Sequence, residues 1–408
     1  MTDTGLWAVK DSIPDHVPAD LVDSFDFYGT GGVNRCPFAT VSRLSNTGRR
    51  IFYNTNDPQC GASWVLTNAE DFRTVLGDPD LFSSRNIAGF SALLGEAWAL
   101  LPVEVDPPAH KIYRSILNPP LAPPAIAKLS DGIRRRAVDL IDSFAGDGGC
   151  EFMCAFGSPF PVSVILQLIG LPDDMTPQFL AWEHDLLANP DIQAKVAAAT
   201  AIKAYLTELM QERRKHPTDD LAGQVVTTEI DGRKLTDDEV MGIYFLLFVG
   251  GLDTVASSLG FYFQHLAEHP EAQARLRADP AIIPRAAEEY VRAFSPVTTR
   301  RIATRDTELA GVTIKQGDWV TLVTALASLD PDVFDDPKTV DFDRKNSRHL
   351  GFAYGPHFCV GSNLARREIH IALEEWMARI PPFSIKPGSS VRAHGGPVMG
   401  LEELHLVW

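Results

Sequence analysis

The chain has 408 residues, of which 45% are hydrophobic and 22% charged, an ordinary composition for a globular protein large enough to enclose a sizeable ligand. Its formal net charge of −16 excludes a protein that coats nucleic acid, because such a protein needs a basic surface. The 5 cysteines are odd in number and irregularly spaced, which argues against a disulfide framework and favours a reducing, cytoplasmic compartment.

The N-terminal part of the chain predicts an irregular arm followed by strands and one helix. Residues 1–45 are rich in Pro, Gly and Asp and show neither a signal peptide nor a regular period. Residues 50–54 and 63–67 predict short strands, and residues 68–76 predict a helix that begins at an asparagine cap. Residues 83–108 lack a clean period and predict a long loop, which inside a compact domain is usually functional.

Helical spacing of apolar residues dominates from residue 109 onwards. It predicts helices over 133–144, 160–169, 177–187, 191–214, 236–269, 284–294 and 362–380. Strands are expected at 307–314, at 318–324 and in the tail 395–408, and a polar meander at 330–347. No stretch reaches the ~18 apolar residues that a membrane span requires, so we expect a soluble protein without a membrane partner.

The absence of repeats and linkers predicts one domain, residues 1–408, that is mainly α with small β-sheets. Its β-rich part is expected at about 46–80 and 300–330, and its helical part at about 109–295 and 362–380. The long helix begins at the cap Thr236, ends before Pro270 and is apolar on every side in its middle, so it should be buried. Gly250 and Gly251 within it each weaken a helix by about 1 kcal/mol relative to alanine, so they need a reason.

The sharpest local signal surrounds Cys359, which lies on a glycine-bounded turn just before the last predicted helix. The positive end of a helix and its N–H groups stabilise a thiolate, so this cysteine is a candidate metal ligand or nucleophile. Gly355 and Gly361 would let the backbone pass close to a flat, bulky ligand. A buried cysteine in an ordinary loop explains the spacing alone equally well.

The ten residues from Phe352 to Gly361 resemble the haem-binding loop of the cytochrome P450 superfamily, F-x-x-G-x-x-x-C-x-G. The resemblance spans about residues 50–408 and implies the cytochrome P450 fold, with the long central helix over a buried haem b. It implies Cys359 as the axial ligand of the haem iron, whose thiolate favours O–O cleavage. Phe352 would lie near the sulfur, Gly361 would permit close packing, and His357 would reach a haem propionate.

Two further groups of residues match the same family. Glu289 and Arg292 form its E-x-x-R pattern on one helix face and imply a structural clamp on the meander, although such a pair read alone is a surface ion pair of small worth. His110 and Arg114, four positions apart, resemble its propionate-binding helix start, and Arg301 would bind the other propionate, since a guanidinium suits a carboxylate.

Gly250, Gly251, Asp253 and Thr254 resemble the oxygen-binding groove of the family. The resemblance implies that the glycines thin the helix for dioxygen, that Thr254 stabilises the bound oxygen species and orders water, and that Asp253 brings protons in. A hydroxyl beside a carboxylate suits a reaction that consumes two protons. Packing against a close neighbour would explain the glycines, but it would not explain a buried Asp–Thr pair.

The double glycine and the C-terminal tail are most similar to the soluble bacterial camphor-hydroxylase branch. This resemblance implies a monooxygenase that hydroxylates a small hydrophobic substrate, such as a terpenoid or norisoprenoid, with O₂ and two electrons from a [2Fe-2S] ferredoxin reduced by a flavin reductase. Positive charge for docking would come from Arg73, Arg114, Arg366 and Arg367.

The substrate pocket is expected to be mostly apolar. The camphor-hydroxylating member holds its ketone with a loop tyrosine, but this chain has no tyrosine between residues 83 and 111, which argues against camphor. Trp98 lies about where that tyrosine would, and its indole N–H could still donate. The expected lining residues are Trp98, Leu100, Leu246, Val249, Val297 and Val398.

Four other functions are open on the sequence alone. A peroxide-driven member of the same fold and a non-catalytic haem sensor both leave the acid–alcohol pair of the long helix unexplained. A thiol hydrolase would use Cys359 with His357, but adjacent positions on one tight turn make a poor dyad. His265, Glu268 and His269 match a zinc-protease pattern, yet histidines at a helix C-terminus also suit its negative end.

Overall fold

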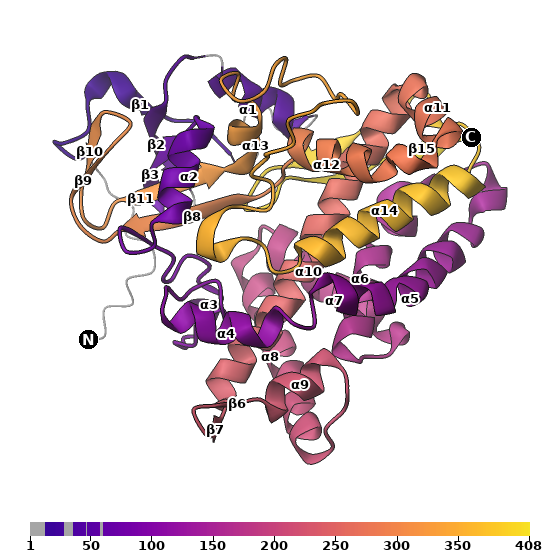
Figure 1. Ribbon diagram of the computed structural model, residues 1–408, viewed down its shortest axis with the longest axis horizontal. Coiled ribbons are helices and arrows are strands. Elements are labelled where there is room, and N and C mark those ends of the chain that lie inside the picture. The colour runs from indigo at the N-terminus through magenta and orange to yellow at the C-terminus, as the bar shows by residue number, and fades with distance from the viewer. Residues whose placement is uncertain (1–12, 28–35, 46, 58–59) are drawn as a thin grey trace. The chain divides into compact units, whose positions relative to one another are not determined.

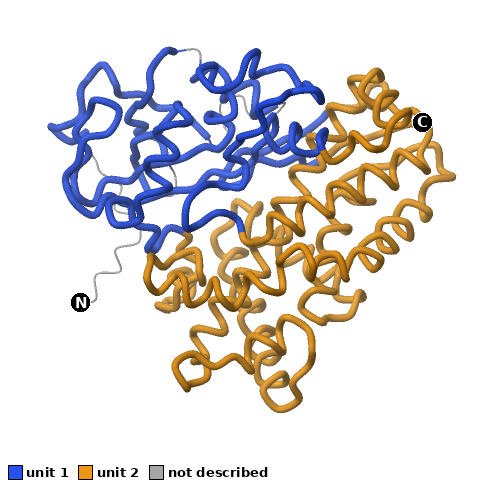
Figure 2. The backbone as a smooth tube through the Cα atoms, in the orientation of Figure 1, with its two compact units in different colours: residues 1–87, 285–359, 391–402 blue, residues 88–284, 360–390, 403–408 orange. Residues whose placement is uncertain are grey.

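The computed structural model describes residues 13–27, 36–45, 47–57 and 60–408. The chain forms two compact units, coloured separately in Figure 2, and each is described by itself. Unit 1 comprises residues 1–87, 285–359 and 391–402, and unit 2 comprises residues 88–284, 360–390 and 403–408. Each unit therefore draws on segments that are far apart in the sequence. The single domain expected from the sequence stays a prediction.

Unit 1 contains a six-stranded sheet in the order β1-β2-β3-β11-β8-β4 (Figure 1). Its strands are β1 (Val22–Asp23), β2 (Ile51–Asp57), β3 (Gly61–Leu66), β4 (Phe82–Ser83), β8 (Thr298–Ala303) and β11 (Trp319–Val323). β2 and β3 form an antiparallel pair, and β11 runs parallel to β3 but antiparallel to β8. Two smaller sheets have two strands each: β9 (Thr307–Leu309) and β10 (Val312–Ile314), which are antiparallel, and β13 (Arg392–His394) with β14 (Gly400–Glu403). The strands predicted around residues 50–54, 63–67 and 318–324 are confirmed, whereas 307–314 is a hairpin of two short strands, because Ala310 and Gly311 have positive φ and turn the chain.

A buried ion pair ties four of these strands together. Arg300 on β8 places Nη2 3.0 Å from Oδ1 of Asp57 at the end of β2, and both side chains are at most 3% exposed. The hydroxyls of Ser63 on β3 and Thr321 on β11 donate to the same carboxylate at 3.3 and 3.4 Å. Because a buried charge is tolerated only when it is paired and hydrogen-bonded, this cluster favours one register of the sheet.

The helices of unit 1 are α1 (Pro37–Ser45), α2 (Ala69–Gly77), α12 (Ile283–Ala293) and α13 (Thr324–Ser328). The side chain of Asn68 accepts the N–H of Glu70, which confirms the predicted cap of α2. The expectation of an irregular arm to residue 45 is wrong for its last part, and residues 1–12 and 28–35 of that arm lie outside the described residues. Helix α1 forms there because Phe38, Val41 and Leu44 recur every three residues and are buried together.

Unit 2 is helical and is organised around α10 (Asp237–Glu268). Its other helices are α3 (Phe90–Leu93), α4 (Ala109–Leu117), α5 (Pro123–Asp142), α6 (Pro159–Ile169), α7 (Thr176–Glu183), α8 (Ile192–Lys215), α9 (Leu221–Thr227), α11 (Pro270–Ala278) and α14 (Ser362–Arg379). Its strands are β5 (Gly149–Glu151), β12 (Ser384–Ile385) and β15 (His405–Val407) in one sheet, with the hairpin β6 (Glu229–Ile230) and β7 (Arg233–Lys234). Helices α6, α7, α8, α9, α11 and α14 all contact α10.

Helix α10 begins where the sequence predicts and for the predicted reason. The Thr236 hydroxyl accepts the Glu239 N–H at 3.2 Å, and the Glu239 carboxylate accepts the Thr236 N–H at 2.7 Å, which makes a reciprocal capping box. The helix is long and apolar enough to cross a membrane by composition, but it is mostly buried within the protein, as the core helix of a soluble protein is. The predicted class, mainly α with small β-sheets, is confirmed.

Candidate functional site

The cysteine loop, residues 352–359, is fixed in unit 1 by its own backbone and by α2. The Cys359 N–H donates to the Phe352 carbonyl at 2.9 Å, which closes the loop. Gly355 has φ +71°, and a Cβ there would lie 2.4 Å from the Leu76 carbonyl oxygen at the end of α2. Gly355 is therefore explained by this turn and by the close approach of α2.

Cys359 differs in its chemistry from three of the four other cysteines. It is exposed on its loop, two residues before the N-cap Gly361 of α14. Burial raises the pKa of the Cys60 and Cys150 thiols to about 12, and a hydrogen bond with Glu151 raises the pKa of Cys154 to about 11. Those three thiols stay protonated at neutral pH, so they are poor metal ligands, because only the thiolate ligates.

The other predicted cofactor residues of unit 1 lie near this loop in the sequence or on the sheet. The ring of His357 makes a hydrogen bond of 3.1 Å with the Ser84 hydroxyl. Phe352 and Phe358 pack edge to face, with ring centroids 6.4 Å apart. Arg301 is 3% exposed on β8, and its Nη1 donates to the Arg300 carbonyl at 2.6 Å. The thiol donor and the buried guanidinium suit the iron and the carboxylates of a haem.

Arg292 on α12 clamps the meander from inside unit 1. It is fully buried and pairs with Glu289 through Nε and Nη2, at 2.8 and 2.7 Å. Its remaining N–H groups donate to the carbonyls of Ser328, Pro337 and Thr339 at 2.8 to 3.0 Å. The pair is therefore not a surface ion pair, and it fixes the path of the chain that leads into the cysteine loop.

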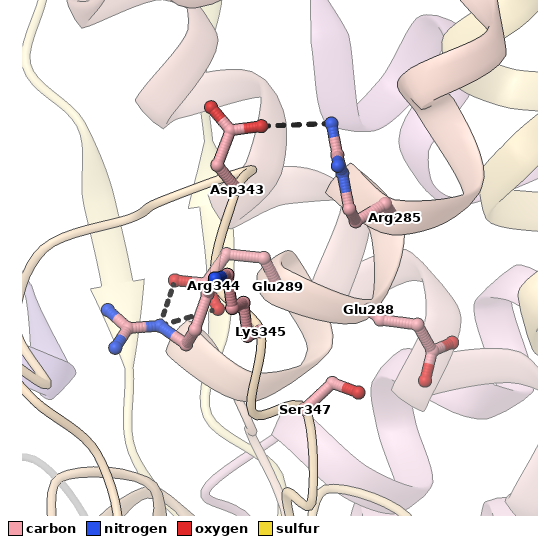
Figure 3. Close-up of a pocket in the computed structure, with 7 residues that line it drawn as sticks. All are labelled: Arg285, Glu288, Glu289, Asp343, Arg344, Lys345 and Ser347. Atoms are coloured by element: carbon pink, nitrogen blue, oxygen red, sulfur yellow. Dashed lines mark hydrogen bonds and ion pairs between the residues drawn. The ribbon is translucent and has the colours of Figure 1, made fainter.

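A cavity of about 330 Å³ lies on the outer side of this clamp, lined by charged residues (Figure 3). Arg344 joins the clamp, with its Nε 3.1 Å from both oxygens of Glu289. Arg285 pairs with Asp343 at 2.9 Å, and both side chains are more than half exposed. Figure 3 shows the exposed ion pair of Arg285 with Asp343 and the more buried ion pair of Glu289 with Arg344, and both Arg285 and Glu289 belong to α12.

In unit 2, the middle of α10 is buried except along one face. Gly250 is exposed, and Leu246, Val249, Asp253 and Thr254 are only partly buried, at the three- and four-residue spacing of a single helix face. Residues on either side, such as Phe245 and Leu252, are fully buried. An apolar core helix with this one open face can hold a ligand along it.

The two glycines of α10 have different structural reasons. A Cβ on Gly251 would lie 2.3 Å from the Ile165 side chain on α6, so this glycine allows two helices to pack closely. A Cβ on Gly250 would meet only Leu246, at 3.6 Å. The idea that both glycines open a groove therefore fits Gly250, whereas helix packing explains Gly251.

The polar pair on the open face belongs to a small hydrogen-bonded group. The Thr254 hydroxyl donates to the Gly250 carbonyl at 3.2 Å, and the Ser257 hydroxyl donates to Asp253 at 2.8 Å. Glu183, at the end of α7, adds a second carboxyl that the sequence did not single out. Burial first, and then the charge of Asp253, raise the pKa of Glu183 well above its ordinary value of 4.5.

The remaining predicted residues of unit 2 lie around α4 and the loop before it. His110 is buried, and Arg114 is partly buried with its Nε 2.9 Å from the Asn118 side chain. Trp98 and Leu100 are buried, and their place in a pocket wall stays a prediction. The Trp98 N–H, however, donates to Glu96 at 2.7 Å, so it is already used. The pocket residues Val297 and Val398 face each other across an isolated β-bridge in unit 1.

The zinc-protease pattern at the end of α10 gains no support. The rings of His265 and His269 stack with centroids 4.2 Å apart, and burial lowers the pKa of His265 to about 4. Within the described part of the chain, no group of three His, Cys, Asp or Glu side chains is placed to hold a metal ion.

Comparison with known proteins gives the family context of this geometry. Residues 167–389 match the family model of cytochrome P450. A probable cytochrome P450 127A1 of Sinorhizobium fredii is 42% identical over 97% of this chain and 97% of its own length. The cytochrome P450 monooxygenase PikC of Streptomyces venezuelae is 31% identical over 91% of each chain. The crystal structure of CYP101C1 superposes with a TM-score of 0.88 and 33% identity, over 97% of this chain and 100% of that chain.

The clamp predicts a large difference between two arginines of α12. Replacing Arg292 with Met leaves carbonyls and a carboxylate buried without their donor, and we expect a loss of about 3–5 kcal/mol in the free energy of unfolding. Replacing Arg285 with Met removes only an exposed ion pair, which should cost less than about 1 kcal/mol. Chemical denaturation followed by circular dichroism measures both; equal losses would contradict the clamp.

The raised pKa of Glu183 predicts a pH-dependent stability. The folded state holds the proton of Glu183 more tightly than the unfolded state, so this group destabilises the fold increasingly as pH rises above 4.5. Glu183→Gln removes that penalty, so its melting temperature should match the parent protein at pH 4 and exceed it increasingly towards pH 8. The gain should shrink in an Asp253→Asn background. A melting difference that is constant with pH would argue against a buried carboxyl here.

Proposed function

As the chain belongs to the cytochrome P450 family of haem b monooxygenases, we propose that it hydroxylates a small hydrophobic compound with dioxygen and two electrons from a [2Fe-2S] ferredoxin. The observation that carries the proposal is the exposed Cys359 thiol on a closed loop, in a chain whose Cys60, Cys150 and Cys154 are held protonated. The reaction takes a hydrocarbon, O₂, two electrons and two protons to an alcohol and water. A cytoplasmic location, where thiols stay reduced, suits such a ligand.

Each part of the site has a role in this reaction. Cys359 would ligate the iron, and a bound haem would supply the activation of dioxygen. Arg301, His110 and Arg114 would neutralise the haem carboxylates, while His357 would orient one of them. On α10, Thr254 holds water by its hydroxyl, and Asp253 passes protons towards it from the side of Glu183.

The open face of α10 supports an apolar substrate. Leu246 and Val249 are the partly exposed side chains next to Gly250, and neither offers a hydrogen bond. A pocket with such a wall selects by shape and by apolar contact. A terpenoid or a norisoprenoid is a compound of this kind.

The surface of unit 1 beside the cysteine loop supports a docking site for the electron donor. A hollow of about 650 Å³ there is lined by Arg73, Arg348, Tyr354 and Phe358, among others. Tyr354 and Phe358 are 45% and 39% exposed, which is unusual for aromatic side chains of this size. Arg73 and Arg348 beside the exposed aromatics favour a partner with acidic side chains, although Glu70 and Asp332 also line the hollow and the overall charge is −16. A ferredoxin reduced by a flavin reductase is such a partner.

The first experiment is the optical spectrum of the purified holoenzyme, reduced and exposed to carbon monoxide. We expect the strongly red-shifted Soret band of a thiolate-ligated haem. Cys359→Ser should abolish that band, because a hydroxyl is a far weaker ligand for iron, whereas Cys154→Ser, at another exposed cysteine, should leave it unchanged. A histidine-type spectrum that survives Cys359→Ser would refute the assignment.

The second experiment tests proton delivery on α10. With a compound that shifts the haem spin state, Thr254→Ala should lower the rate of hydroxylation by ~100-fold, because a positioned donor is lost. Electron consumption should continue, with the electrons appearing as hydrogen peroxide. Thr254→Ser, which keeps the hydroxyl, should retain most of the coupling. Full hydroxylation by Thr254→Ala, or by peroxide alone without protein partners, would favour the peroxide-driven alternative.

A further inference from the structure

The loop that precedes α4, residues 88–108, is held together by hydrogen bonds to one buried carboxylate. Glu104 is 6% exposed and accepts the N–H groups of Ala88, Gly89 and Leu100 at 2.7, 3.2 and 2.8 Å. A buried carboxylate needs such donors, so these two distant stretches of the loop are held together. The loop therefore has a definite conformation although it contains only the short helix α3.

The same loop is seated on α10. The Leu101 N–H donates to the Gly242 carbonyl at 3.2 Å. A Cβ on Gly242 would lie 2.1 Å from the Ala99 carbonyl oxygen, so only glycine lets the loop approach this closely. The Trp98 ring packs on the Phe245 ring of α10, with the two centroids 5.1 Å apart. The Phe90 ring packs on the same Phe245 ring, with the two centroids 5.5 Å apart.

Two successive interactions, through Glu96 and Lys203, connect the Trp98 indole to α8. One oxygen of Glu96 accepts the Trp98 N–H at 2.7 Å, and the other pairs with the ammonium of Lys203. The hydrogen bond from Lys203 lowers the pKa of Glu96, so the carboxylate remains charged between its two donors at neutral pH. Trp98 is 6% exposed, whereas Lys203 and Glu96 are each about one-third exposed. These three side chains thus extend from the surface of α8 to the buried wall beside α10.

We infer that Lys203, Glu96 and Trp98 form a latch that fixes the loop on α8 and makes Trp98 an apolar specificity element. The inference rests on the proposed function, since the open face of α10 lines the substrate pocket in that proposal and the sequence analysis predicts Trp98 in the same wall. Glu96 is the positioning residue: it takes the only hydrogen-bond donor of the indole and leaves the ring itself to the ligand. The substrate therefore presents a hydrocarbon group to Trp98 and gains no hydrogen bond from it.

The latch makes a direct prediction about the Trp98 N–H. In the diamagnetic carbon monoxide complex of the ¹⁵N-tryptophan-labelled holoenzyme, Trp98→Phe identifies the signal. Its hydrogen exchange should be about tenfold faster in Glu96→Leu, which removes a charged acceptor. Lys203→Met should accelerate the exchange of the Trp98 N–H about two- to fivefold, as expected for loss of a part-exposed ion pair. Lys203→Arg should keep the exchange as slow as in the parent protein. Lys315→Met, which removes the exposed pair with Asp306, is the matched control and should have no effect.

A pair of ligands with one skeleton tests the specificity. Adamantane and 2-adamantanone differ only by a carbonyl, so the parent holoenzyme should bind adamantane at least about fivefold more tightly, because the Trp98 N–H is already used by Glu96 and does not compensate for the desolvation of the carbonyl. Glu96→Leu frees the indole N–H and should shift the ratio about fivefold towards the ketone. Trp98→Phe with Glu96→Leu should cancel that shift.

Two results would overturn the latch while leaving the proposed function intact. One is a thiolate-type spectrum together with a parent preference for the ketone of fivefold or more. The other is Trp98 exchange that is unchanged in both Glu96→Leu and Lys203→Met. Conversely, a protein without the thiolate-type spectrum whose Trp98 exchange still responds to Glu96→Leu would support the latch and refute the proposed function.

Discussion

A buried guanidinium must find acceptors for its N–H groups, and much of unit 1 follows from how Arg292 meets this requirement. It draws Glu289 of its own helix and the carbonyls of Ser328, Pro337 and Thr339 to one point. This fixes residues 330–347, which form no regular elements and so have no ladder of their own to hold them. Just beyond, a Cβ on Gly351 would lie 2.8 Å from Val291 and from Ser295, so the chain enters the cysteine loop pressed against the end of α12.

Whereas Arg292 fills its surroundings with contacts, the buried helix α10 leaves one face open. Most of the helix is packed on all sides, so one missing side chain at Gly250 creates space that neighbours do not fill. Because Gly251 has no side chain, α10 packs closely against α6 at this position. Adjacent glycines thereby separate two functions, a rigid support on one side and a ligand surface on the other.

Much of this organisation could be predicted from the sequence, because it rests on local signals. The capping box at Thr236, the asparagine cap of α2 and the short runs of β-branched and aromatic residues in β2 and β3 are properties of short segments, and the structure has these elements. The family resemblance of the cysteine loop is local as well, and the match to cytochrome P450 confirms it. The contacts of Glu183 and Lys203 could not be predicted, since they pair residues 70 and 107 positions apart, and nothing local distinguishes them from other charged residues. Helix α1 was missed because Pro and Gly around it hid a short apolar repeat.

The order of segments in unit 1 has a consequence for how the protein is made. Strands β2 and β3 emerge early from the ribosome, but β11, the next partner of β3, is part of the segment that begins at residue 285. At the usual pace of synthesis the roughly 250 residues between β3 and β11 take about 13–50 s, during which β3 has an unpaired edge. Until β11 is made, the open edge of β3 can pair with another chain, and the cysteine loop is made after β11, so haem can bind through Cys359 only after residues 88–284 have been synthesised.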